Sequence, residues 1–217
     1  MKKKVLPVIV AILLILVIGG CALGKVLLDK YSYSKEEADW NEFYQVSEND
    51  RSAIILQNEM VEEQALIKDG VCYFDLATVH KYMNEVFYAD MTENLLLYAT
   101  PTEVIRTTFG ETAYTTTEGT QEAGYVISFV DGDNVYVAAD YVKLFTNYSY
   151  ECYDRHVQVN TEWGTRQVAQ LKKDTAVRLR GGVKSPILTQ AVKGDTLEIL
   201  EQMETWSKVK TADAVIG

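Results

Sequence analysis

Two segments of the chain carry the same hydrophobic pattern at an offset of 63 residues. Each segment has the pattern of a strand, a short helix and two further strands. Five pairs of positions coincide at this offset: Tyr73 with Tyr136, Val79 with Val142, Tyr82 with Phe145, Asn84 with Asn147, and Phe87 with Tyr150. Because the matching positions are those that pack in a core, the pattern predicts a scaffold of two β–helix–β–β units in tandem.

Local spacing places the elements of both units. The first unit has a turn at Lys68–Gly70 and a helix pattern from Asp75 to Asn84. The second unit has a turn at 131–134 and a helix pattern from Ala138 to Phe145. Apolar runs predict strands around them at 53–56, 65–68, 71–74, 87–89, 95–98, 104–107, 135–137, 150–152 and 157–159. Together these elements define a domain over residues 52–162.

Residues 29–51 precede this domain and are polar and acidic. Ser34 and Glu37 fit a capping box, with Ser34 as the N-cap. Trp40, Phe43 and Tyr44 then fall on one helical face. We therefore predict a short helix that begins at Ser34 and links the N-terminal segment to the domain. Its aromatic face either packs on the domain or binds a partner, and we favour packing.

The N-terminal segment, residues 1–28, has the pattern of an export signal. Three lysines precede an uncharged run from Val5 to Gly24, close to the ~20 residues that a helix needs to cross a bilayer. Lysines on that side hold the N-terminus in the cytoplasm. We predict a transmembrane signal anchor in the cell membrane, with the body of the protein outside. Two other fates remain open: cleavage as a signal peptide, or cleavage before Cys21 with lipidation.

Charge excludes one large class of partners. The formal net charge is −10, and the lysines of the N-terminal segment leave the rest of the chain more acidic still. An acidic body repels nucleic acid and other anionic polymers. The sequence also lacks a basic stripe with interleaved aromatic residues, so we predict no nucleic-acid partner.

Cysteine and histidine residues are the first candidates for chemistry. Cys72 and Cys152 could pair in an exported chain, but each lies in a strand pattern, and we favour two buried hydrophobes. Cys152 and His156 would lie roughly 13 Å apart in an extended segment, too far for a nucleophile and its base. His80 and His156 lack the spacing of metal ligands.

The remaining candidates are weaker. Residues 131–134 have the sequence Asp-Gly-Asp-Asn, which favours a hairpin turn because a calcium loop needs further carboxylates. The chain lacks a phosphate-binding glycine loop and a nucleophile elbow. Its 14 tyrosines could stack on sugar rings, although alternating strand positions favour core packing. We predict no catalytic, cofactor-binding or metal-binding residues.

Residues 173–217 form a second predicted domain, with strand patterns at 173–180, 185–188, 193–200 and 205–210. The run Val177–Gly182, the turn at Ser185–Pro186, Lys193–Asp195 and Trp206–Val209 resemble a bacterial SH3-like domain of the cell-wall type. This resemblance implies a small β-barrel whose last strand would follow Gly217. We therefore expect an incomplete barrel in the N-terminal part of a longer protein.

The order of elements over residues 52–162 resembles the stalk-like copper amine oxidase N-terminal-like domain. The copper in that name belongs to another domain of another enzyme, and we expect none here. The predicted fold class is α+β and mostly β: an N-terminal transmembrane helix, a stalk of two β–helix–β–β repeats, and an incomplete C-terminal SH3-like barrel.

The combination of anchor, stalk and SH3-like domain resembles the front of membrane-anchored family 18 glycoside hydrolases of clostridia-type bacteria. Those enzymes cleave N-acetylated β-1,4 glycans in a barrel that carries an Asp-x-x-Asp-x-Asp-x-Glu run, which these residues lack. The resemblance implies a non-catalytic anchoring and cell-wall-targeting region that binds the cytoplasmic membrane and peptidoglycan. The alternative is a stand-alone wall-binding adaptor with no enzymatic activity.

Overall fold

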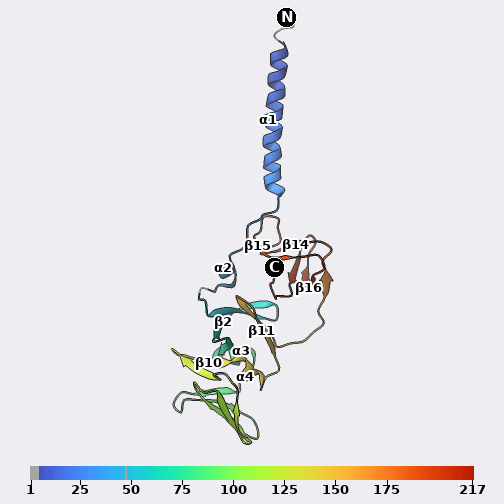
Figure 1. Cartoon of the computed structure of the whole chain (residues 1–217). Coiled ribbons are helices and arrows are strands. Elements are labelled where there is room, and N and C mark those ends of the chain that lie inside the picture. Colours follow the sequence, from blue (N-terminus) through green and yellow to red (C-terminus); the bar gives the residue numbers. More distant parts are fainter. Residues whose placement is uncertain (1–4, 47) are drawn as a thin grey trace.

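The computed structural model describes residues 5–46 and 48–217. The molecule is elongated (Figure 1). Helix α1 (Val5–Tyr31) projects from one end, and beside it lie the strands of the C-terminal module, which we define as residues 168–217. A central seven-stranded sheet follows, and a five-stranded distal sheet forms the other end. Strands hold far more residues than helices, so the protein is mostly β.

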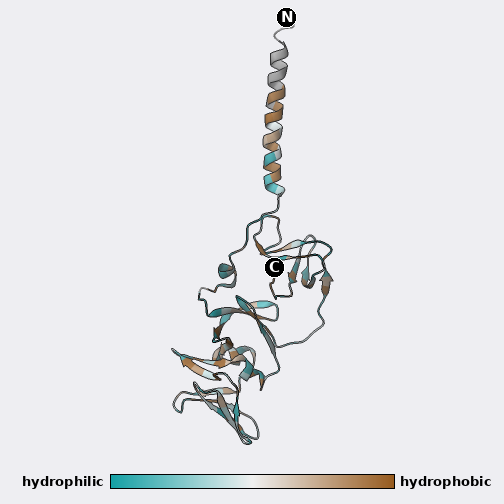
Figure 2. Ribbon diagram, viewed as in Figure 1, coloured by the Kyte–Doolittle hydropathy of each residue, from teal (hydrophilic) through white to brown (hydrophobic). Residues whose placement is uncertain are grey.

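Helix α1 corrects the expected N-terminal anchor. It leaves the body as a single straight helix and becomes hydrophilic toward Tyr31 (Figure 2). Within the part of the chain that the structure describes, no helix is both long enough and apolar enough to cross a membrane. The predicted transmembrane helix, and with it the single-pass localisation in the cell membrane, is therefore wrong. Lys2, Lys3 and Lys4, on which the predicted orientation depended, lie outside the described residues.

The linker to the central sheet also differs from its prediction. Helix α2 spans only Trp40–Tyr44, and its N-cap is Asp39, whose side chain accepts hydrogen bonds from two backbone amides of the first turn. The predicted capping box at Ser34 is wrong, because residues 34–38 are extended. Ala38 N donates to Ile187 O and Ile187 N donates to Glu36 O, so this stretch pairs with a strand far away in the sequence.

The central sheet has the strand order β11-β12-β1-β2-β3-β10-β9. Among the strand pairs described in this sheet, β1–β12 is parallel and the others are antiparallel. Asp69 and Gly70 both have positive φ at the tight β2–β3 turn, the conformation that such hairpins require. The strands are β1 (Arg51–Leu56), β2 (Glu59–Lys68), β3 (Val71–Asp75), β9 (Ser128–Asp131), β10 (Asn134–Ala138), β11 (Ser149–Cys152) and β12 (His156–Asn160).

A local two-fold relation lies at the middle of this sheet. Phe74 in β3 and Val137 in β10 occupy equivalent positions at the 63-residue offset, and they are also cross-strand partners. The pair of Tyr73 with Ala138 is the equivalent of the pair of Tyr136 with Asp75. Hairpins β2–β3 and β9–β10 therefore flank the axis symmetrically, and each leads into a short helix, α3 (Leu76–Tyr82) or α4 (Ala139–Lys143).

The main core lies between this sheet, the two helices and the distal sheet. Phe74, Val79, Val137 and Val142 are completely buried within it. The distal sheet has the order β4-β5-β6-β7-β8. Its strands are β4 (Phe87–Asp90), β5 (Leu95–Ala99), β6 (Val104–Thr108), β7 (Ala113–Thr116) and β8 (Gly119–Glu122).

The C-terminal module contains two small sheets, ordered β13-β16-β17 and β14-β15. Val177, Ala191 and Leu197 form its own small core. Val209 and Gly217 exchange two backbone hydrogen bonds, so the last described residues pair with β17. The strands are β13 (Val168–Gln170), β14 (Thr175–Arg178), β15 (Ile187–Ala191), β16 (Thr196–Gln202) and β17 (Ser207–Lys210).

Candidate binding groove

The two histidines singled out from the sequence lie in different elements and serve different contacts. His80 in α3 is exposed, and its Nε2 lies 2.7 Å from Phe87 O. His156 is buried between the rings of Tyr44 and Tyr153, each at a centroid distance of 4.8 Å. Burial holds the pKa of His156 below its ordinary value. Among residues 5–46 and 48–217, no three His, Cys, Asp or Glu side chains gather to hold a metal ion.

Cys152 and His156 belong to neighbouring strands joined by a tight turn. Tyr153 N donates to His156 O there, and Cys152 pairs with Val157 across the ladder. The thiol of Cys152 interacts with that of Cys72, the partner that the sequence left open as an alternative. Cys72 is buried as expected, but Cys152 is exposed, so the prediction of two buried cysteines is wrong for Cys152. Residues 131–134 form the β9–β10 hairpin turn, with Gly132 at positive φ, as predicted.

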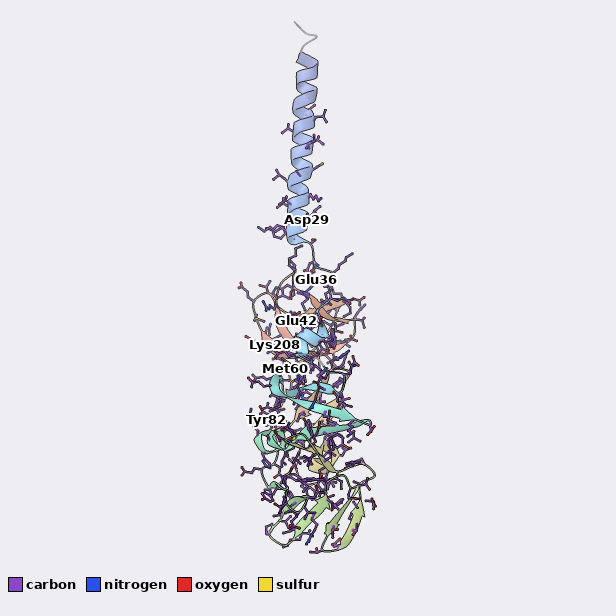
Figure 3. The ribbon with its side chains drawn as sticks, turned by 90° about the vertical axis from the view of Figure 1, so that its left-hand side faces the viewer. Asp29, Glu36, Glu42, Met60, Tyr82 and Lys208 are labelled. Atoms are coloured by element: carbon purple, nitrogen blue, oxygen red, sulfur yellow. The ribbon has the colours of Figure 1, made fainter. Side chains whose placement is uncertain are left out.

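A groove of about 850 Å³ lies where the C-terminal module meets the central sheet and the linker. In Figure 3, Glu42, Lys208 and Met60 mark this junction on one side of the molecule, and Tyr82 lies further toward the distal sheet. Three parts of the chain supply its apolar lining. The groove is lined by Phe43 and Tyr44 from the linker, Ile55 and Met60 from the central sheet, and Val177, Leu179, Leu197, Ile199, Trp206, Val209 and Ile216 from the module.

Trp206 dominates the module side of the groove. It follows a turn after β16, and its half-buried indole packs over Gly181. A Cβ at position 181 would lie only 3.1 Å from Trp206 Cγ, so a glycine allows this close approach. Because Leu197 and Ile199 alternate along β16 on the same side, they continue the apolar surface beneath the indole.

The β1–β2 hairpin supplies the opposite wall. Gln57 takes a left-handed conformation at its tip, with φ of 58°, and Ile55 and Met60 point their apolar side chains into the groove from the flanking strands. Met60 is 40% exposed, and its flexible, polarizable side chain can adapt to a bound partner. This wall was not predicted, because it depends on contacts between distant parts of the chain.

Tyr44 closes the groove on the linker side. The ring stacks on His156, and Phe43 meets it edge-on at a centroid distance of 4.7 Å. Its hydroxyl is buried and has no hydrogen-bond partner among the described residues. Burial raises the pKa of Tyr44 above its ordinary value, so the hydroxyl stays protonated. An unpaired buried hydroxyl is costly.

Two charged groups near the groove are engaged by other parts of the protein. Lys210 is buried, lies 3.1 Å from a carboxylate oxygen of Glu198, and donates to Asn58 Oδ1 at 2.5 Å. Arg178 donates to the carbonyl oxygens of Ser34 and Ser185. These contacts fasten the module to the hairpin tip and to the linker. The groove therefore combines an apolar floor with a few polar groups, which is the usual composition of a ligand site.

Comparisons of the chain with protein-family models, with curated proteins and with solved structures found no match.

Proposed function

We propose that this chain is a non-catalytic wall-binding region whose groove takes a segment of peptidoglycan. One observation carries the proposal: the aromatic side chains of Trp206, Phe43 and Tyr44 line the same groove. An aromatic side chain offers a flat apolar face to the C–H face of a sugar ring. The groove therefore offers the kind of surface on which the sugar rings of a glycan can stack.

The shape of the groove also favours a polymer over a small metabolite. Its walls come from the linker, a hairpin of the central sheet and the C-terminal module, so it follows a junction between parts and does not sink into one core. Arg178 is held by two backbone carbonyl oxygens, whereas Arg180 and Lys208 are exposed on the lining of the groove.

The finer proposal is that the chain serves a family 18-like glycoside hydrolase, and it rests on the sequence resemblance alone. Binding to the wall would raise the effective concentration of such an enzyme near its substrate. Reading the coding frame past Gly217 at its source locus separates this proposal from the adaptor alternative. A barrel with an Asp-x-x-Asp-x-Asp-x-Glu run supports the hydrolase, and an immediate stop codon supports the adaptor.

Co-sedimentation with purified, insoluble peptidoglycan tests wall binding directly. Trp206→Ala should weaken binding by about tenfold or more, as expected for a loss of ~1.4 kcal/mol. Trp163→Ala is the matched control, because Trp163 is 58% exposed and does not line the groove. It should bind like the unaltered protein.

A second variant guards against unfolding of the module. Met60→Lys changes the groove from the hairpin side at a partly exposed position, so we expect it to fold normally and to reduce binding. Circular dichroism confirms the fold of each variant. Equal sedimentation of all variants, or none by the unaltered protein, would refute the proposal.

A further inference from the structure

Strands β3 and β11 face one another although three strands separate them in the order of the central sheet. The rings of Phe74 in β3 and Tyr150 in β11 meet edge-on at a centroid distance of 6.4 Å. Cys72 lies two residues before Phe74, and Cys152 lies two residues after Tyr150. Since side chains two residues apart share a face of a strand, the same facing surfaces carry both cysteines.

The two thiols interact across this interface, and each shifts the pKa of the other. Cys72 is buried in the main core, whereas Cys152 is exposed at the surface. The described residues around them do not supply a third metal-binding side chain in range. A buried thiol held against an exposed one is an arrangement suited to thiol–disulfide exchange.

We propose that Cys72 and Cys152 are a redox pair that closes to a disulfide when the protein meets a low-molecular-weight disulfide. In the first step the Cys152 thiolate attacks one sulfur of the oxidant, forms a mixed disulfide and releases one thiolate. In the second step Cys72 gives its proton to solvent and attacks Cys152 Sγ, which displaces the second thiolate. Two protein thiols are thereby oxidised, and one small disulfide is reduced to two thiols.

The surroundings of the two sulfurs set this order of attack. The interaction with Cys72 lowers the pKa of Cys152, which favours its thiolate. The same interaction, together with burial, raises the pKa of Cys72. Cys152 is therefore the accessible nucleophile, and Cys72 is the resolving thiol. The site is independent of wall binding, because neither cysteine lines the groove.

The test uses the whole chain with Cys21→Ser, which removes the third cysteine. The folded protein is treated with oxidised glutathione, then unfolded and alkylated, and its intact mass is measured. We expect the intact mass to show that both thiols are lost and that no glutathione is attached to the protein. Peptide mapping should then identify a disulfide between Cys72 and Cys152. The oxidised protein should also melt at a higher temperature than the reduced protein, because the crosslink constrains the unfolded chain.

Two single variants separate the roles of the sulfurs. Cys72→Ala should retain a stable glutathione adduct on Cys152, since the resolving thiol is missing. Cys152→Ser should leave Cys72 largely unmodified in the folded state and reactive once the chain is unfolded in urea. The proposal would be overturned if the parent protein kept both thiols free, or if it accumulated glutathione on Cys152 beside a free Cys72.

Discussion

The two β–helix–β–β units share an order of elements but meet different neighbours. The first unit contains β3, α3, β4 and β5, and the second contains β10, α4, β11 and β12. The closing strand of the second unit, β12, pairs in parallel with β1 and stays in the central sheet. The closing strand of the first unit, β5, pairs with β6 and belongs to the distal sheet.

This difference shows which features of the fold depend on the local sequence and which depend on distant parts of the chain. Apolar spacing and turn residues specify a strand, a helix and two strands in both units. The partner of the last strand depends on which other strand is available. Ile54 of the buried strand β1 pairs with Val157, whereas β5 pairs with β6, which follows it directly in the chain. Similar local sequences thus enter different sheets.

The prediction with the largest expected effect compares equivalent aromatic residues in the two units. Phe87 is completely buried against Tyr98 and Phe145, whereas its counterpart Tyr150 is only half-buried. Phe87→Ala should lower the free energy of unfolding by about 3–5 kcal/mol. Tyr150→Ala should lower it by about 1–3 kcal/mol. Urea denaturation measures both, and equal losses would mean that the two units are packed alike.

A smaller test concerns the helix starts. The side chain of Asp75 accepts a hydrogen bond from Thr78 N at 2.6 Å and caps α3, whereas Ala138 at the start of α4 provides no side-chain cap. Asp75→Ala should cost about 1 kcal/mol of stability. Asp75→Asn retains a capping oxygen and should cost far less. If both variants lose the same stability, the carboxylate charge matters and the cap does not.

The smallest test asks whether one unit alone responds to pH. His156 lies in β12 of the second unit, and burial keeps its pKa below the ordinary value in the folded state. The unfolded chain therefore binds a proton that the folded chain does not, and stability falls as pH drops below about 6.5. The fall ends at the lower folded pKa. Asp213, whose carbonyl oxygen lies 3.1 Å from Nε2, is the nearest acidic residue.

Denaturation of His156→Phe at about pH 7.5 and about pH 5.5 isolates this contribution. Phenylalanine keeps an aromatic ring between Tyr44 and Tyr153 but cannot take up a proton. The variant should show a weaker dependence of stability on pH than the parent. An unchanged dependence would assign the effect to other groups.

Local patterns predicted much of the fold. The turn at Asp69–Gly70, the helix after Asp75 and the strand–helix order of both units follow from spacing and turn chemistry. Strands β7 and β8 were not predicted, because their threonine-rich and polar residues lack an apolar alternation. A side-chain contact helps to hold this region together, because the hydroxyl of Thr107 in β6 donates to Ala113 O in β7.

Contacts between distant residues explain the remaining errors and omissions. Ser34 and Glu37 fit a capping box, but pairing of this stretch with β15 keeps it extended. The groove joins Tyr44, Met60 and Trp206 from three regions, and only the last lies in a segment whose resemblance suggested wall binding. No local signal marks such a junction, since each residue also suits ordinary core packing.

The most direct test of the proposed function is the fluorescence of Trp206 during titration with soluble peptidoglycan fragments. Trp40→Phe and Trp163→Phe together leave it as the only tryptophan of the three in the chain. If the groove binds the wall glycan, the emission should shift and saturate, and Met60→Lys should weaken the response. An emission spectrum that stays constant while the fragments bind elsewhere, or do not bind at all, would contradict the proposed function.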